Sequence, residues 1–303
     1  MAVLTEATKK LYGFSRGTQA LLSIAQPLVA VLVVTDDPPL PRLAATTAAL
    51  ALAYVAVFAL NDLLDVGLDR ARFDHERSYD GFDVDSAGFR HPVARGALPF
   101  GAAVAWVGGL MAVSLAIAAW LGPVCVVLLV VAAGLEVLYC RLATVTPHKC
   151  ALSGVMVALG AAVGAFAMDV PVPALPLGLF LVWLALWEIG GRNLVNDMGD
   201  VEEDSQLGIR TVPVVRGPVV AARWAFRCAL GSSIAGIALA VALQPLYGLV
   251  GVVGVAVAAW TTLLDPARKL LREPTAERAM AVFNRGTFHP VLVLAALLLG
   301  SAV

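Results

Sequence analysis

The chain has 303 residues, of which 60% are apolar and only 14% are charged, and its formal net charge is −1. Soluble globular domains carry about 45–50% apolar and about 25% charged residues. Together with a mean hydropathy of +0.85, this composition excludes an ordinary soluble protein. It predicts an all-α, polytopic protein of the lipid bilayer in which residues 1–303 form a single domain. No nucleic-acid partner is expected.

Nine apolar segments are long enough to cross a bilayer, because the hydrocarbon core needs about 20 helical residues. They lie near residues 17–35, 43–61, 101–121, 123–140, 150–168, 174–196, 219–243, 246–264 and 287–302. Proline and glycine separate several of them, as at 36–41 and at Gly122-Pro123. The polar, basic N-terminus leads into a full-length first segment. We therefore expect a first transmembrane helix there rather than a cleaved signal.

The distribution of positive charge predicts how these helices are oriented. Of the 21 lysines and arginines, all but Arg42 fall before the first span or in and beside the loops after spans two, four, six and eight. Cytoplasmic loops are enriched in Lys and Arg. We therefore expect an integral protein of the plasma membrane, with a cytoplasmic N-terminus and an external C-terminus.

Two acidic motifs in the chain share the pattern N-D-x-x-D-x-x-x-D. The first occupies residues 61–69 and the second residues 196–204. On an unbroken helix, aspartates at i, i+3 and i+7 fall within about 60° of one face. Each motif is therefore expected to point three carboxylates in one direction. Four spans separate the motifs, so both are expected at the cytoplasmic ends of helices, facing each other across a central cavity.

The paired motifs indicate a Mg²⁺ site that also holds a diphosphate. Mg²⁺ prefers oxygen ligands and is commonly bound by carboxylates together with phosphates, and it neutralises charge that develops on a leaving group. The candidate metal ligands and catalytic residues are Asp62, Asp65, Asp69, Asp197, Asp200 and Asp204. Asn61 and Asn196 are candidate substrate contacts. The basic residues placed to complete a diphosphate site are Arg72, Arg90, Arg95, Lys149 and Arg210.

The elements around these motifs resemble the UbiA superfamily of intramembrane prenyltransferases over essentially the whole chain. The segment 91–96, His-Pro-Val-Ala-Arg-Gly, is similar to the Arg-Pro-x-x-x-Gly element that follows the first motif in this family. The segment 208–213, Gly-Ile-Arg-Thr-Val-Pro, is similar to the element that follows the second. Tyr139, near the end of the fourth span, matches a tyrosine that precedes a short basic loop.

This resemblance implies a reaction and the residues that carry it. Members of the superfamily bind an isoprenyl diphosphate through Mg²⁺ between the two motifs, with the prenyl tail in an apolar tunnel. Ionisation gives an allylic cation that an acceptor, often aromatic, captures. Arg210 matches a diphosphate contact and Tyr139 a residue near the cleaving bond. A tyrosine there could stabilise a cation or hold the diphosphate, or it could simply pack.

The sequence departs from the family pattern at three places. His91 stands where the family commonly has arginine, so that contact is either lost or supplied by Arg90 or Arg95. A lysine that often follows the tyrosine is missing, and its role is expected to pass to Arg141 or Lys149. The loop over residues 70–90 is long and acidic. It is either a lid that excludes water from a carbocation or a solvated insertion.

Glu188 and Arg192 lie four residues apart near the inner end of the sixth span. They are either a buried ion pair that sets helix packing or a pair that lines the cavity and touches the acceptor.

Alternative functions remain open in the sequence. A terpene cyclase on the same scaffold would capture the cation with the prenyl chain's own double bonds, and no motif separates it from a transferase. An ion-coupled transporter is disfavoured, because its ion sites would lie near the membrane midplane. A CDP-alcohol phosphotransferase would need an acidic pattern that is absent. The acceptor, the prenyl length and the oligomeric state cannot be read from the residues.

Overall fold

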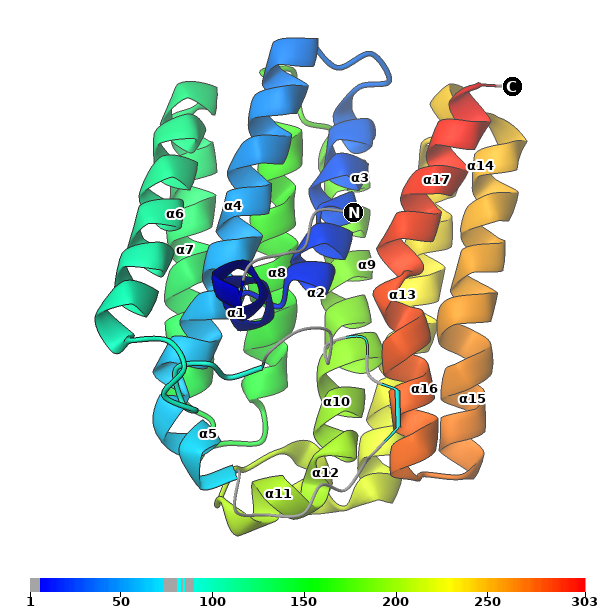
Figure 1. Cartoon of the computed structure of the whole chain (residues 1–303). Helices are drawn as coiled ribbons and strands as arrows, with labels where there is room; N and C mark the ends of the chain where they lie inside the picture. Colours follow the sequence, from blue (N-terminus) through cyan, green and yellow to red (C-terminus); the bar gives the residue numbers. More distant parts are fainter. Residues whose placement is uncertain (1–5, 73–80, 83, 85–89, 303) are drawn as a thin grey trace.

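The computed structural model describes residues 6–72, 81–82, 84 and 90–302. The described residues form a bundle of α-helices with two π-helical segments, η2 and η3, and contain no strand (Figure 1). In chain order the elements are α1 (Glu6–Phe14), α2 (Gly17–Ser23), α3 (Ala25–Val34), α4 (Leu40–Leu64), α5 (Val66–Arg72), α6 (Phe100–Leu121), α7 (Pro123–Arg141), α8 (Lys149–Phe166), α9 (Ala174–Trp187), η2 (Glu188–Asn193), α10 (Leu194–Gly199), α11 (Val201–Gln206), α12 (Val212–Arg216), α13 (Pro218–Ala242), α14 (Gln244–Ala259), η3 (Trp260–Leu264), α15 (Asp265–Arg272), α16 (Ala276–Thr287) and α17 (His289–Ser301).

Within the described part of the chain, nine helical segments are long and apolar enough to cross a membrane. The expected number of spans is therefore confirmed, and most boundaries fall within a few residues of those expected. The last two segments differ, because they extend to Gln244–Arg272 and Ala276–Ser301. The polar connector after the eighth apolar segment is helical and continues both spans, so these helices reach beyond the apolar residues that marked them.

The two acidic motifs lie at the same end of the bundle. In Figure 1, α5 follows the first motif's helix and α11 belongs to the second motif, and both lie at the lower end together with α12. The α3–α4 connection and the C-terminus lie at the opposite, upper end. This arrangement confirms that an even number of spans separates the motifs and brings them to one side of the bundle.

The π-helical segment η2 packs tightly between two helices because it contains glycines. A Cβ atom added at Gly190 would lie 2.8 Å from the carbonyl oxygen of Ala225 on α13. One added at Gly286 on α16 would lie 2.7 Å from the carbonyl oxygen of Gly191. Small residues at such crossings allow the backbones of membrane helices to approach closely. The approach fixes the position of η2, which carries Glu188 and Arg192.

Arg42, the one basic residue expected on the external side, has a structural role. Its guanidinium donates to the carbonyl oxygens of Leu121 at 3.2 Å and Ala167 at 2.7 Å, beside the C-terminal ends of α6 and α8. It also pairs with Asp169 at 3.2 Å. Carbonyls at the end of a helix have no partner within it. Arg42 therefore satisfies two of them and ties α4 to two neighbouring helices.

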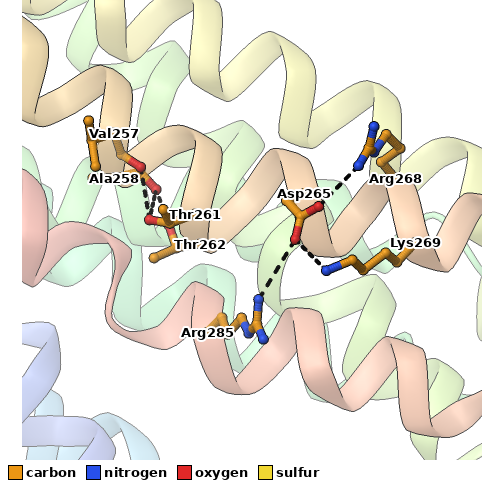
Figure 2. A network of polar contacts seen from close by, with 8 residues as sticks. All are labelled: Val257, Ala258, Thr261, Thr262, Asp265, Arg268, Lys269 and Arg285. Atoms are coloured by element: carbon orange, nitrogen blue, oxygen red, sulfur yellow. Dashed lines mark hydrogen bonds and ion pairs between the residues drawn. The ribbon is translucent and has the colours of Figure 1, made fainter.

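A second polar cluster lies where α14 passes through η3 into α15 (Figure 2). The hydroxyls of Thr261 and Thr262 donate to the carbonyls of Val257 at 2.8 Å and Ala258 at 2.6 Å. Asp265, at the start of α15, contacts three cations: Lys269 at 2.6 Å, Arg268 at 3.3 Å and Arg285 at 3.9 Å. The pair with Arg285 links α15 to α16. These groups are partly exposed, so each pair contributes little to stability.

Candidate active site

Each acidic motif is interrupted at its middle aspartate. Helix α4 ends at Leu64 and α5 begins at Val66, and Asp65 between them has φ −94° and ψ 8°. Helix α10 ends at Gly199 and α11 begins at Val201, and Asp200 between them has φ −111° and ψ 16°. The helix expected through each motif is therefore interrupted at its middle aspartate. Asp197, Asp200 and Asp204 of the second motif nevertheless all line one cavity, whereas the first motif contributes only Asp65 to it. The two motifs nevertheless share the same local break.

Both motifs contribute to one cavity. The cavity has a volume of about 260 Å³ and lies among α2, α4, α7, α8, η2 and α10. Its lining includes nine of the side chains proposed from sequence: Asn61, Asp65, Arg90, Tyr139, Lys149, Asn196, Asp197, Asp200 and Asp204. Four of these are carboxylates, one from the first motif and three from the second. The central cavity between the motifs therefore exists.

Asp62 and Asp69 are not among the residues that line this cavity. Their carboxylates converge instead on Nδ1 of His91, at 2.7 Å from Asp62 and 2.8 Å from Asp69. All three side chains are buried. The expectation that all six motif carboxylates face one cavity is thus wrong for these two. Asp62 lies on α4 and Asp69 lies seven residues later on α5, a spacing that brings both side chains to the same side of the chain.

The backbone around His91 is shaped for this contact. His91 has φ 52°, a left-handed conformation that few residues other than glycine adopt. The following turn is closed by the carbonyl oxygen of Pro92, which accepts from the amides of Ala97 at 2.8 Å and Leu98 at 3.0 Å. Burial by itself lowers the pKa of His91, but the hydrogen bonds and charges of Asp62 and Asp69 outweigh it and raise the pKa above its ordinary value. His91 therefore lies between two carboxylates of the first motif.

Two of the proposed basic residues, Arg90 and Lys149, line the cavity. Nζ of Lys149 lies 3.4 Å from the hydroxyl of Tyr139 and 4.5 Å from the centre of its ring. The amide of Asn193 on η2 donates to the same hydroxyl at 2.8 Å. Lys149, rather than Arg141, therefore supplies the positive charge beside Tyr139.

The remaining proposed basic residues lie elsewhere. Arg95, Arg141 and Arg210 are exposed and are not among the cavity-lining residues. The expectation that they reach a diphosphate in this cavity is therefore not supported by their position. The side chain of Arg72 and most of the loop 70–90, including residues 73–80, 83 and 85–89, lie outside the described residues. The lid proposed for that loop stays a prediction.

Two charged residues that the sequence analysis did not select complete the wall beside the first motif. Glu136 on α7 accepts a hydrogen bond from the amide of Asn61 at 2.8 Å. Arg16, next to α2, donates to the amide oxygen of Asn61 at 3.3 Å. Both line the cavity. Glu136 carried a usable signal, because a single carboxylate in the middle of an apolar span is costly unless it has a function.

Further polar groups lie deeper in the cavity. The Tyr54 hydroxyl donates to Gln26 at 2.9 Å, and Ser153 donates to Glu188 at 2.6 Å. Tyr54 precedes Asp65 by 11 residues, a distance of about 16 Å along the helix. Arg192 donates to Thr287 and stacks on Phe283. Glu188 and Arg192 both line the cavity. Each therefore faces the cavity and also contacts a neighbouring helix.

The donor set of this cavity fits a hard divalent cation. Asp65, Asp197, Asp200 and Asp204 offer only carboxylate oxygens, which are the ligands that Mg²⁺ prefers. Burial and the charge of Asp69 raise the pKa of Asp65 to about 6, against the opposing effect of the Lys149 charge. A cation among these carboxylates would remove the cost of gathering like charges.

Comparison with known proteins identifies a family for this chain and solved structures with a similar fold. The model of the "UbiA prenyltransferase family" matches residues 23–289. A UbiA homolog from Archaeoglobus fulgidus bound to GPP and Mg²⁺ has a similar structure, with a TM-score of 0.72, 16% identity, and coverage of 97% of this chain and 100% of that one.

Two further solved structures agree with it. A UbiA homolog from Aeropyrum pernix K1 without ligand has a TM-score of 0.72 and 18% identity, with coverage of 92% and 96% of the two chains. A structure described as digeranylgeranylglyceryl phosphate synthase has a TM-score of 0.71 and 17% identity, with coverage of 98% and 99%. No curated protein is significantly similar in sequence to this chain.

Proposed function

This chain belongs to the UbiA prenyltransferase family, and on that premise we propose that it transfers the prenyl group of an isoprenyl diphosphate to an acceptor within the membrane, in a reaction that depends on Mg²⁺. The observation that carries the proposal is the meeting of two acidic motifs in one cavity. Asp65 comes from the first motif, and Asp197, Asp200 and Asp204 come from the second. Solved structures of the same fold bind DMAPP or GPP together with Mg²⁺.

The residues of the cavity have separate roles in this proposal. The four aspartates would hold Mg²⁺, which when bound neutralises the charge that develops on the leaving diphosphate. Arg90 and Lys149 supply positive charge to its outer oxygens. Tyr139 accepts from Asn193 and contacts Lys149, so it holds the lysine side chain in place. Asn61 is engaged by Arg16 and Glu136 and therefore orders the wall rather than binding metal.

The deeper cavity has an apolar wall suited to a prenyl chain. Its apolar lining includes Val57, Phe58, Met111, Leu129 and Met156. The same space also holds the hydrogen-bonding pairs Tyr54–Gln26 and Ser153–Glu188. These polar groups lie beyond the diphosphate region. They favour an external acceptor that makes hydrogen bonds, rather than cyclisation of the prenyl chain on itself. A terpene cyclase is the second candidate, and the experiment below separates the two.

The expected setting is the plasma membrane, with the aspartates on the cytoplasmic side, so that a water-soluble diphosphate group reaches them from the cytoplasm. The positive charge of the loops on that side supports this orientation.

The test uses purified protein with geranyl, farnesyl and geranylgeranyl diphosphates, with Mg²⁺ or with EDTA. Diphosphate release that requires Mg²⁺ is expected for at least one substrate. Asp65→Asn and Asp200→Asn are expected to reduce it by a factor of at least about 100, because each removes a charge from the metal site. Asp37→Asn, on the exposed external loop, is the matched control and should keep wild-type activity.

The outcomes discriminate between the candidate reactions. Full activity in EDTA or in both aspartate variants would rule out the proposed chemistry. A cyclic hydrocarbon formed without added acceptor would identify a cyclase. Prenylation of an added aromatic or lipid acceptor would identify a transferase.

A further inference from the structure

Glu136 is a buried carboxylate that the binding of metal and diphosphate does not use. It lies within the span Pro123–Arg141 and lines the cavity with only 4% of its surface exposed. Its Oε1 accepts from Asn61 at 2.8 Å, and the thiol of Cys140 lies 3.5 Å away. A carboxylate at this depth is costly, which makes a functional role the default expectation.

The position of Glu136 is set by the first motif. Its partner Asn61 precedes Asp65 by one helical turn, and the amide of Asp65 donates to the carbonyl of Asn61 at 3.0 Å. One turn of helix corresponds to about 5 Å along the axis. On the proposed function, with the diphosphate at the aspartates, the layer of Glu136 is where the first carbon of the prenyl chain would lie.

The proposed reaction releases a proton in this layer. The bond between the first prenyl carbon and the diphosphate oxygen breaks, and its electron pair leaves with the diphosphate. The attacking atom of the acceptor then bonds to that carbon. If this atom carries hydrogen, as in a hydroxyl, an amine or an aromatic C–H group, the proton must pass to a base. A cation that instead ends as an alkene also loses a proton.

Other carboxylates of the cavity are less suited to accept this proton. Asp65, Asp197, Asp200 and Asp204 are the proposed metal ligands, so their oxygens are engaged. Glu188 accepts a short hydrogen bond of 2.6 Å from Ser153 on α8. It precedes Asp197 by nine residues, which is about 13 Å along a helix.

We propose that Glu136 takes up the proton that leaves the acceptor, and that the acceptor is therefore an uncharged molecule whose attacking atom is an O–H, N–H or aromatic C–H group. The inference rests on the proposed function. Arg16 and Asn61 keep the carboxylate oriented toward the cavity, since Asn61 bridges the two. An acceptor carrying a carboxylate would meet repulsion from Glu136.

Glu136→Gln tests the proposal, because a glutamine oxygen still accepts from Asn61 while the base is removed. Glu277→Gln is the matched control, because it makes the same change at an exposed residue of α16 that is not among those lining the cavity. Both variants are assayed with Mg²⁺ and the prenyl diphosphate that is most active with the wild type. Three quantities are measured: diphosphate release, prenylation of 2-naphthol or 4-hydroxybenzoate, and the ratio of hydrocarbon to prenyl alcohol.

Diphosphate release by Glu136→Gln is expected within about threefold of wild type, because ionisation precedes proton loss. The yield of proton-losing products, relative to prenyl alcohol, is expected to fall by at least about 100-fold, the usual contribution of a general base. Glu277→Gln should retain the wild-type ratio. 2-Naphthol should be preferred over 4-hydroxybenzoate, since only the latter carries a carboxylate.

Three results would overturn the inference. One is an unchanged product ratio in Glu136→Gln. Another is equal loss of diphosphate release and of product, which would indicate a purely structural role. The third is a wild-type protein that releases diphosphate but gives only the alcohol with every probe. Failure of the underlying function looks different, because the wild type would then release no diphosphate at all.

Discussion

Removal of the His91 side chain is expected to destabilise the protein through repulsion between two aspartates. The ligand atoms of Asp62, Asp69 and His91 lie within 4.8 Å of one another. Two unit charges at that separation repel by about 3 kcal/mol at an effective dielectric constant of 20. His91→Ala removes the imidazole that both carboxylates contact. The free energy of unfolding should therefore fall by about 3 kcal/mol in metal-free buffer.

The assay is equilibrium unfolding in detergent micelles with increasing SDS, followed by circular dichroism. His91→Arg is the matched control, because it keeps a positive charge, and it should lose less than His91→Ala. Addition of Mn²⁺ or Mg²⁺ should restore part of the stability of His91→Ala by placing a cation between Asp62 and Asp69. Wild-type stability of His91→Ala in EDTA would refute the electrostatic explanation.

The pH dependence of this difference has a defined sign. The pKa of His91 is raised in the folded protein by its aspartate partners. A raised pKa stabilises the folded state fully at pH values below the ordinary histidine pKa of about 6.5. The difference in stability between wild type and His91→Ala should thus be larger at pH 6 than at pH 9, and should decline as the pH rises through the folded-state value.

Three further changes test the fold and the site. Gly286→Ala should lower the free energy of unfolding by about 1–3 kcal/mol, because the new methyl group meets the carbonyl oxygen of Gly191 at 2.7 Å. Gly108→Ala on α6 is the control, because the new methyl group there has open space. It should be neutral in the same thermal unfolding assay. Arg42→Ala should cost about 1–3 kcal/mol in thermal unfolding, because it leaves two carbonyls at helix ends without their donor. Lys149→Met should weaken the binding of prenyl diphosphate at least about tenfold by isothermal titration, because a charge at the proposed diphosphate site is lost. Unchanged affinity would place the diphosphate elsewhere.

The sequence determined the features that depend on composition and local pattern. Nine apolar runs predicted nine spans because the bilayer requires a fixed length of apolar helix. The spacing between the two acidic motifs predicted that they lie at one end of the bundle, since an even number of spans returns the chain to the same side. The resemblance to the UbiA superfamily rested on short elements such as residues 208–213, and the family match agrees with it.

Only the tertiary structure decided which carboxylates share the cavity. Helical periodicity assigned Asp62, Asp65 and Asp69 to one face, but Asp62 and Asp69 contact His91 while Asp65 lines the cavity. The periodicity could not show this division, because His91 comes from a separate segment that meets the two aspartates only in the folded chain. Glu136 likewise acquired a role only once Asn61, 75 residues away in sequence, was found at 2.8 Å. Local patterns specify which groups a helix carries, and long-range packing specifies which of them meet.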